Sequence, residues 1–206
     1  MDKFMQSLQK LPTPCYVVDE AKLTKNLEIL RSVSEQAGCK ILLAQKAFSM
    51  FALYPLIGQY LAGTAASGLF EARLGHEAMG GETHVFSPAY TGADFDEILR
   101  YADHIVFNSF AQWECFKAKA LAAGKRCGIR VNPECSTQEH AIYDPCSPFS
   151  RLGVTRANFR EDLLDGLDGL HFHTLCEQNS NALIETVAVI EEKFGGILPK
   201  MRWVNF

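Results

Sequence analysis

A lysine at the end of an apolar strand is the residue that points most directly to chemistry. Lys46 follows the apolar run 40–44 and precedes a segment of helical period. At the mouth of a barrel, apolar neighbours desolvate a lysine, which lowers the pKa of its ammonium group and makes the amine nucleophilic. Such an amine can form a Schiff base with a carbonyl compound. The alternative interpretation is a surface lysine that snorkels at the end of a strand.

A pair of histidines is the second candidate. His171 and His173 alternate with Phe172, so both imidazoles face one side of a strand. His173, which lies at the end of the strand, could stack on a planar cofactor or act as an acid or base. The alternative interpretation is a core histidine that is hydrogen-bonded to the backbone. The H-x-H spacing would also suit zinc. No acidic residue or further histidine stands at a supporting spacing, so we expect no bound metal.

Arg130 is a charged residue within an otherwise apolar strand. A buried arginine needs a partner, either a carboxylate or the anionic part of a ligand. Glu71 and Glu77, on a predicted helix, are the candidate carboxylates, although a solvated helix face explains them equally well.

An alternation of short apolar strands and helical segments must position these residues. The predicted strands cover residues 40–44, 63–66, 83–86, 104–107, 126–131, 169–172 and 201–206. The predicted helices between them cover 50–61, 69–79, 94–101, 111–123 and 181–194, and a further helix follows Asp19. Between 132 and 150 lies an irregular stretch whose length is typical of a functional or disordered loop.

Strands that are apolar throughout and alternate with helices predict a parallel sheet covered on both faces. A doubly wound sheet is one possibility, but no G-x-G-x-x-G motif follows the first strand. A (β/α)8 barrel fits better, because polar residues gather where the strands end. These residues are Lys46, Ser67, Ser87, Asn108, Asn132 and His173.

Composition excludes several classes of protein. The 206 residues are 48% hydrophobic and 21% charged, which is typical of a globular protein. The net charge of −4 disfavours a nucleic-acid or anionic-membrane surface. No apolar run reaches the roughly 20 residues of a membrane span, and no signal peptide opens the chain. Seven scattered cysteines without a C-x-x-C pair predict free thiols in a reducing cytoplasm.

Several strings, in their order along the chain, resemble the fold-type III, pyridoxal-phosphate-dependent decarboxylases, a group that includes the ornithine and diaminopimelate decarboxylases. They are T-P-C-Y-V-V-D (13–19), Lys46 after the first barrel strand, Arg130 in the fifth, S-R-L-G-V (150–154), and F-H (172–173). Within that group, L-A-Q-K-A-F-S (43–49), Y-D-P-C (143–146) and H-F-H-T-L-C-E-Q (171–178) are most similar to the carboxynorspermidine/carboxyspermidine decarboxylases. The resemblance extends over essentially the whole chain.

The resemblance implies a cofactor, pyridoxal 5'-phosphate, and a role for each matching residue. Lys46 would bind the cofactor aldehyde, His173 would stack on the pyridine ring, and Arg130 would belong to the surrounding network. Further cofactor-binding residues would be Ser67 beside the cofactor and Cys176 near its phosphate. Glu177 and Gln178 would face the substrate.

The implied reaction is the decarboxylation of carboxynorspermidine or carboxyspermidine to norspermidine or spermidine in polyamine biosynthesis, by a cytoplasmic homodimer. A polyamine-like substrate needs acidic residues along its groove, for which Glu134, Asp144 and Glu177 are candidates. Other members of the group, namely a diaminopimelate decarboxylase or an amino-acid racemase, are alternatives. A non-catalytic barrel and a cofactor-free aldolase-type barrel are further ones.

The implied fold is a (β/α)8 TIM-like barrel of the alanine-racemase type. A complete barrel takes about 250 residues, so we expect seven βα units here, with a C-terminal β-domain missing from the chain. Residues 1–19 would form an entry strand that joins that β-domain, and residues 20–206 an incomplete barrel. The phosphate-binding loop of the family would follow the last strand, beyond Phe206.

Overall fold

The computed structural model describes residues 3–206, and the side chains from residue 6 onward. It divides into two compact units, Met1–Ile41 and Leu42–Phe206. Among the described residues, no helix is long and apolar enough to cross a membrane.

The first unit is helical. It contains α1 (Lys3–Leu8), which the sequence analysis did not predict, and α2 (Glu20–Ala37). Asp19 caps α2 because its carboxylate accepts a hydrogen bond from the backbone N–H of Lys22. Gly38 ends the helix in the left-handed conformation that glycine adopts without strain. Residues 12–19 pair with no strand of this chain. The entry strand that would join a further β-domain stays a prediction.

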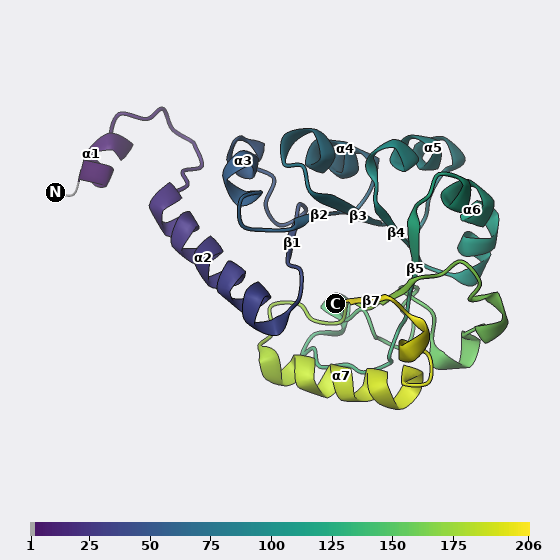
Figure 1. The fold of residues 1–206 in the computed structure, drawn as a ribbon. Coiled ribbons are helices and arrows are strands. Elements are labelled where there is room, and N and C mark those ends of the chain that lie inside the picture. Colours follow the sequence, from purple (N-terminus) through teal and green to yellow (C-terminus); the bar gives the residue numbers. More distant parts are fainter. Residues whose placement is uncertain (1–2) are drawn as a thin grey trace. The chain divides into compact units, whose positions relative to one another are not determined.

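The second unit is built on one curled sheet of seven parallel strands in the order β1 to β7 (Figure 1). The strands are β1 (Leu42–Ala44), β2 (Gly63–Ala66), β3 (Glu82–Phe86), β4 (His104–Phe107), β5 (Arg126–Arg130), β6 (Gly169–His171) and β7 (Trp203–Asn205). Consecutive strands are neighbours throughout, as in a βα barrel. All seven predicted strands are therefore confirmed in place and order.

Helices cover the outer side of this sheet (Figure 1). They are α3 (Tyr54–Ile57), α4 (Leu69–Ala78), α5 (Gly92–Tyr101), α6 (Phe110–Ala122) and α7 (Ser180–Phe194). The core between strands and helices is aromatic and aliphatic, with Phe95, Phe107 and Trp113 among its fully buried side chains. Burying these rings supplies much of the free energy that holds helices to strands.

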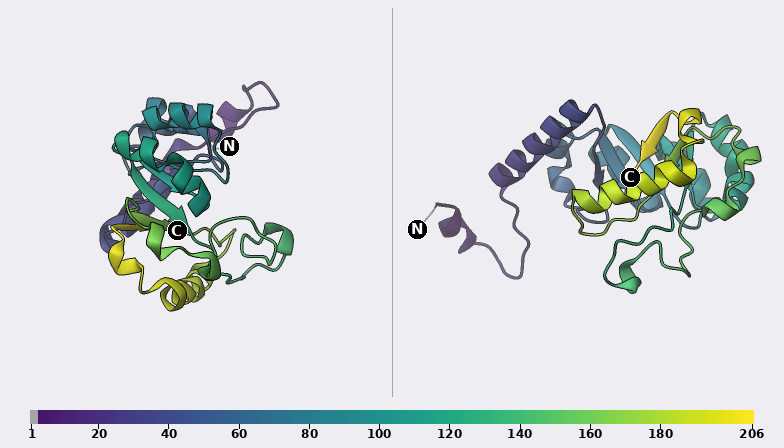
Figure 2. Two further views of the ribbon diagram at one scale, coloured as in Figure 1. Left: turned by 90° about the vertical axis from the view of Figure 1, so that its right-hand side faces the viewer. Right: turned by 90° about the horizontal axis from the view of Figure 1, so that it is seen from below.

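One crossover differs from the prediction, whereas the irregular stretch expected after the fifth strand is present. The helix expected over 50–61 is a 3-10 turn, η1 (Phe51–Leu53), followed by the single turn of α3, since Pro55 favours a helix start and Gly58 ends it. No α-helix links β5 to β6. The connection instead holds three short 3-10 helices: η2 (Ala141–Tyr143), η3 (Arg156–Asn158) and η4 (Glu161–Leu163). Around η2 this connection extends away from the barrel (Figure 2).

The Trp203 side chain inside the barrel explains two glycines. A Cβ on Gly169 would lie 2.1 Å from the indole of Trp203, and one on Gly128 would lie 2.3 Å from the same ring. Trp203 thus occupies space on the inner face of β5 and β6 that side chains there would otherwise fill. The remaining short connection before β7 is η5 (Leu198–Lys200).

Candidate functional site

Lys46 lies in a turn that follows β1. Backbone hydrogen bonds from Ala47 and Phe48 back to the strand end close this turn. The neighbouring Gln45 is fully buried and anchors it, because its side-chain amide donates to the carbonyl oxygen of Glu71 (2.8 Å) and accepts from the Tyr54 hydroxyl (3.3 Å). Lys46 itself is exposed. The expectation that its protein neighbours desolvate it is wrong for this structure, and its amine is open to a ligand.

Arg130 is the last residue of β5 and is buried with 4% of its surface exposed. Its Nη2 donates to the carbonyl oxygen of His173 (3.0 Å), and its guanidinium lies 4.6 Å from the centre of the Phe86 ring. Its Nε is buried and has no hydrogen-bond partner. Burial lowers the pKa of Arg130 to about 10. A buried cation with an unused N–H is suited to bind an anion or a carbonyl oxygen.

The expected carboxylate partners of Arg130 lie elsewhere. Glu71 accepts a hydrogen bond from the backbone N–H of Ser67 (2.6 Å), and Glu77 forms an exposed ion pair with Arg73 (2.8 Å). Both carboxylates therefore bond to groups in α4 or in the turn before it. The alternative of a solvated helix face fits Glu77.

His173 follows the end of β6, and its exposed side chain lies at the same edge of the sheet as Lys46 and Arg130. The pKa of His173 is lowered by partial burial of the ring and then by the positive charges of Lys46 and Arg130. Lys46, Arg130 and His173 stand where β1, β5 and β6 end, and Arg130 contacts the backbone of His173. The neutral form of His173 is favoured, which suits stacking on a flat ring.

Two residues earlier, His171 lies on the inner face of β6. Its Nδ1 is 2.5 Å from Oδ1 of Asn205 on β7, and its ring centre is 5.4 Å from that of Phe86. Burial, followed by the charge of Arg130, lowers the pKa of His171 to about 3. The intervening Phe172 packs in the core on the opposite face, so the predicted alternation is confirmed.

The remaining cofactor candidates are exposed. Ser67 follows β2 and donates its backbone N–H to Glu71. Cys176 lies beyond β6, where its carbonyl oxygen accepts a 3.4 Å hydrogen bond from Gln138. Ser67 directly follows a strand and Cys176 lies in the segment beyond one, and neither side chain has a protein partner among the described residues.

Gln178 joins two loops. Its Oε1 accepts hydrogen bonds from Thr137 Oγ1 (2.7 Å) and Gln138 Nε2 (2.9 Å), and its Nε2 donates to the carbonyl oxygen of Thr137. The amide group of Gln178 thus holds the segment after β5 against the segment after β6. Its neighbour Glu177 is exposed, has a left-handed backbone (φ 54°) and contacts no polar partner in the described part of the chain.

The two other acidic candidates already have partners. Glu134 lies 3.5 Å from Nζ of Lys193. Asp144 accepts hydrogen bonds from Ser136 Oγ (2.5 Å) and from the backbone N–H of Cys146 (2.8 Å). Of the three predicted acidic residues, only Glu177 is therefore free for a cationic ligand in the described structure.

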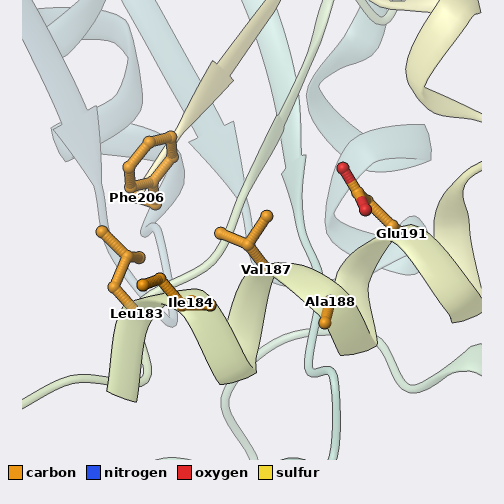
Figure 3. A pocket seen from close by; sticks show the side chains of 6 residues that line it. All are labelled: Leu183, Ile184, Val187, Ala188, Glu191 and Phe206. Carbon is orange, nitrogen blue, oxygen red and sulfur yellow. The ribbon is translucent and has the colours of Figure 1, made fainter. Parts of the chain in front are cut away.

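A hollow beside α7 is apolar and includes none of these groups. It is lined by Leu183, Ile184, Val187, Ala188, Glu191 and Phe206 (Figure 3). With a single ionisable side chain, it offers no constellation for acid–base or nucleophilic chemistry. The candidate active site is therefore the edge where β1, β5 and β6 end.

The fold is shared with known decarboxylases. Diaminopimelate decarboxylase from Helicobacter pylori, solved with L-lysine, superposes with a TM-score of 0.80 over 98% of this chain and 55% of that one. Its sequence identity is 18%, so the likeness concerns the fold alone. No protein-family model matches the chain. The structure thus defines an α/β barrel-like fold of the kind found in this group of decarboxylases.

Other relatives are more similar to this chain in sequence, and they are named for the decarboxylation of carboxylated polyamines. The chain is 42% identical over 198 residues to the carboxynorspermidine/carboxyspermidine decarboxylase of Campylobacter jejuni, covering 96% of this chain and 51% of that protein. It is 39% identical to the carboxyaminopropylagmatine decarboxylase of Synechocystis, with the same two coverages. The crystal structure of C. jejuni carboxynorspermidine decarboxylase with norspermidine gives a TM-score of 0.87 at 41% identity, covering 95% of this chain and 50% of that one.

The chain is therefore homologous, over nearly all of its length, to the carboxynorspermidine/carboxyspermidine decarboxylases. It spans about half the length of the curated relatives it matches.

Proposed function

We propose that this chain carries the cofactor-binding barrel of a pyridoxal-phosphate-dependent decarboxylase that converts carboxynorspermidine or carboxyspermidine into norspermidine or spermidine. One observation supports the proposal: in this chain, which is homologous to these decarboxylases, Lys46, Arg130 and His173 stand at or just after strand ends on one edge of the sheet. An α/β barrel binds its ligands at this edge, where the strands end.

The residues at this edge fit the cofactor. Its aldehyde needs an accessible amine, which Lys46 offers. Its planar ring needs a flat partner, and the exposed imidazole of His173 is one. The buried Nε of Arg130 lacks a partner and so has a hydrogen bond left to give. Ser67, directly after β2, and Cys176, in the segment after β6, are both exposed and are the further candidates to contact the cofactor.

Each residue has a defined task in the reaction. Lys46 would hold the cofactor through its aldehyde, and its amine would be the nucleophile for that attachment. His173 orients the ring, and Arg130 fixes His173 through its carbonyl oxygen. When bound, pyridoxal phosphate supplies a protonated ring that accepts the electron pair left by departing CO2. Glu177 is the described acidic group free to bind a cationic amine of the substrate.

A second substrate is favoured by one specific observation. The Synechocystis relative, at 39% identity, is named for carboxyaminopropylagmatine, which carries a guanidinium group in place of a terminal amine. Both substrate types present a carboxylated carbon beside an amine and a distant cation, so the same residues would serve either. A diaminopimelate decarboxylase and an amino-acid racemase remain less favoured, because the solved diaminopimelate decarboxylases share only the fold.

The wider predictions rest on the same homology. We infer that the barrel is of the alanine-racemase type and that the working enzyme is a cytoplasmic homodimer. The free state of all seven cysteines is consistent with a reducing compartment. The C-terminal β-domain stays a prediction.

A substrate panel tests the function. CO2 release is measured from carboxynorspermidine, carboxyspermidine, carboxyaminopropylagmatine, diaminopimelate and ornithine, using the complete protein that contains this chain. We expect release from one or more of the first three. Release from diaminopimelate or ornithine alone would overturn the proposal.

A labelling experiment tests the cofactor. Borohydride reduction in the presence of pyridoxal phosphate should bleach the visible absorbance and leave the label on Lys46. Lys46→Arg should lose the absorbance and the activity, while Lys25→Arg on the exposed face of α2 should keep both. Retention of both by Lys46→Arg would refute the assignment.

A further inference from the structure

A second group of chemically active side chains lies at the opposite ends of the strands. It consists of Glu82 and His84 on β3 and His104 on β4. The register places His84 directly beside His104, and the two imidazoles stack with centres 3.9 Å apart and planes 10° apart. Glu82 and His104 begin their strands, whereas Lys46 follows the end of β1, so this histidine cluster is separate from the candidate active site.

The spacing of the potential ligand atoms suits a small metal ion. One ligand atom from each of the three side chains lies within 4.8 Å of the others. His84 Nε2 and Glu82 Oε2 are 3.1 Å apart. Two ligands bound to a tetrahedral zinc ion at 2.0–2.1 Å lie about 3.3 Å apart, so this pair is already at coordination distance. The third ligand requires His104 to rotate out of its stack on His84, because an ion lies in the plane of each imidazole that binds it.

An unsatisfied nitrogen marks the same cluster. His104 is 4% exposed, and its Nδ1 is buried without a hydrogen-bond partner. Leaving a buried polar atom without a partner is unfavourable, and native structures contain few such atoms. A metal ion bound to the His104 ring, together with reorientation of that ring, would relieve this cost.

The residues around the histidine cluster leave one side of it open to solvent. The indole of Trp203 meets the ring of His104 edge-on, with centres 5.4 Å apart, and closes the inner side. Glu82 and His84 keep 27% and 16% of their side chains exposed, so an ion can enter past them. Three protein ligands leave a fourth tetrahedral position for water.

We propose that Glu82, His84 and His104 form a binding site for a divalent transition-metal ion of the zinc type, which ties β3 to β4 at the start of the strands. Two imidazoles and one carboxylate favour Zn²⁺ or Co²⁺, whereas Mg²⁺ and Ca²⁺ require oxygen ligands. This site was not expected from the sequence, where only the H-x-H pair 171–173 suggested zinc. The register of two strands, rather than a local spacing, brings its residues together.

Metal titration of the purified, metal-free protein tests the site. Co²⁺ should bind with a one-to-one stoichiometry and give the visible bands of a tetrahedral complex, and Zn²⁺ should displace it. Glu82→Gln and His104→Gln should each weaken binding at least about tenfold, because even partners of metal ligands contribute that much. His140→Ala, which removes an exposed histidine from the connection after β5, should bind as the parent does.

Several outcomes would overturn the proposal. They are the absence of Co²⁺ binding, unchanged affinity in both glutamine variants, or charge-transfer bands that reveal cysteine ligands. If His104→Gln fails to fold, Glu82→Gln decides, since its amide keeps a hydrogen bond to His84. The binding readout is independent of decarboxylation, so failure here and failure of the proposed function can be told apart.

Discussion

Arg130 holds the backbone of His173. Its Nη2 donates a 3.0 Å hydrogen bond to the carbonyl oxygen of His173, and its guanidinium packs over Phe86 on β3. One side chain therefore connects the ends of three strands, β3, β5 and β6. The imidazole proposed to stack on the cofactor takes its position from this bond.

Replacing Arg130 with lysine tests this arrangement. A lysine side chain would keep the charge but lose the planar group that packs on Phe86 and bonds to the backbone at the same time. We expect Arg130→Lys to weaken pyridoxal phosphate binding about tenfold, which corresponds to about 1.4 kcal/mol. Spectroscopic titration with the cofactor measures this affinity.

The matched control is Arg100→Lys, which changes an exposed arginine paired with Glu97 on α5. It should leave cofactor affinity unchanged, because exposed ion pairs contribute little. Equal affinity in both variants would mean that Arg130 does not position the cofactor site.

A glycine beside Trp203 should be intolerant of a methyl group. In Gly169→Ala the new Cβ would lie 2.1 Å from the indole ring, so Trp203 or β6 must shift. We expect a loss of about 1–3 kcal/mol in the free energy of unfolding, as for other overpacked cores. Chemical denaturation gives this value.

Gly196→Ala is the control for that measurement. A Cβ at Gly196 meets nothing within 4 Å and its backbone is not left-handed, so stability should change by less than about 0.5 kcal/mol. A Gly169→Ala protein as stable as the parent would show that the inner face of the barrel has room to adjust.

The strands were predictable because each is a short apolar run between turn residues, and this pattern is local. The helix over 50–61 was not, since hydrophobic period alone ignored the effect of Pro55 and Gly58. The crossover from β5 to β6 was also beyond prediction in detail, because three 3-10 turns carry no periodic signal.

The candidate site was predictable only in part. Lys46, Arg130 and His173 stand at strand ends, which a barrel brings to one edge. The partners of Arg130 were missed because Phe86 and the His173 carbonyl lie more than forty residues away from it in the chain. A backbone carbonyl acceptor leaves no trace in residue types.

The neighbouring residues Glu177 and Gln178 should have different functions, one in substrate binding and the other in holding two loops together. Gln178→Leu removes three hydrogen bonds to Thr137 and Gln138, so the connection after β5 should lose protection from amide hydrogen exchange. Glu177→Gln removes a charge without a described partner, and should raise the KM for the cationic substrate while exchange stays as in the parent. Exchange mass spectrometry and steady-state kinetics give the two readouts.

The converse result would reverse the two assignments. A Gln178→Leu protein with parental exchange and a raised KM would make Gln178 the substrate-binding residue, as the resemblance implied. A Glu177→Gln protein with a parental KM would remove Glu177 from the substrate site.

Acid should destabilise the barrel through His171. Because its folded-state pKa is about 3 and an unfolded histidine titrates near 6.5, the unfolded chain binds a proton that the folded chain does not between these values. The contribution of His171 to stability is complete above pH 6.5 and falls by about 1.4 kcal/mol per pH unit as the pH decreases toward 3. In His171→Phe, which cannot be protonated, unfolding free energy measured from pH 7 to 4.5 should decrease less steeply than in the parent. The control His140→Phe changes an exposed histidine, so its unfolding free energy should depend on pH as steeply as in the parent. The same pH dependence in all three proteins would show that His171 is protonated as readily in the folded state as in the unfolded one.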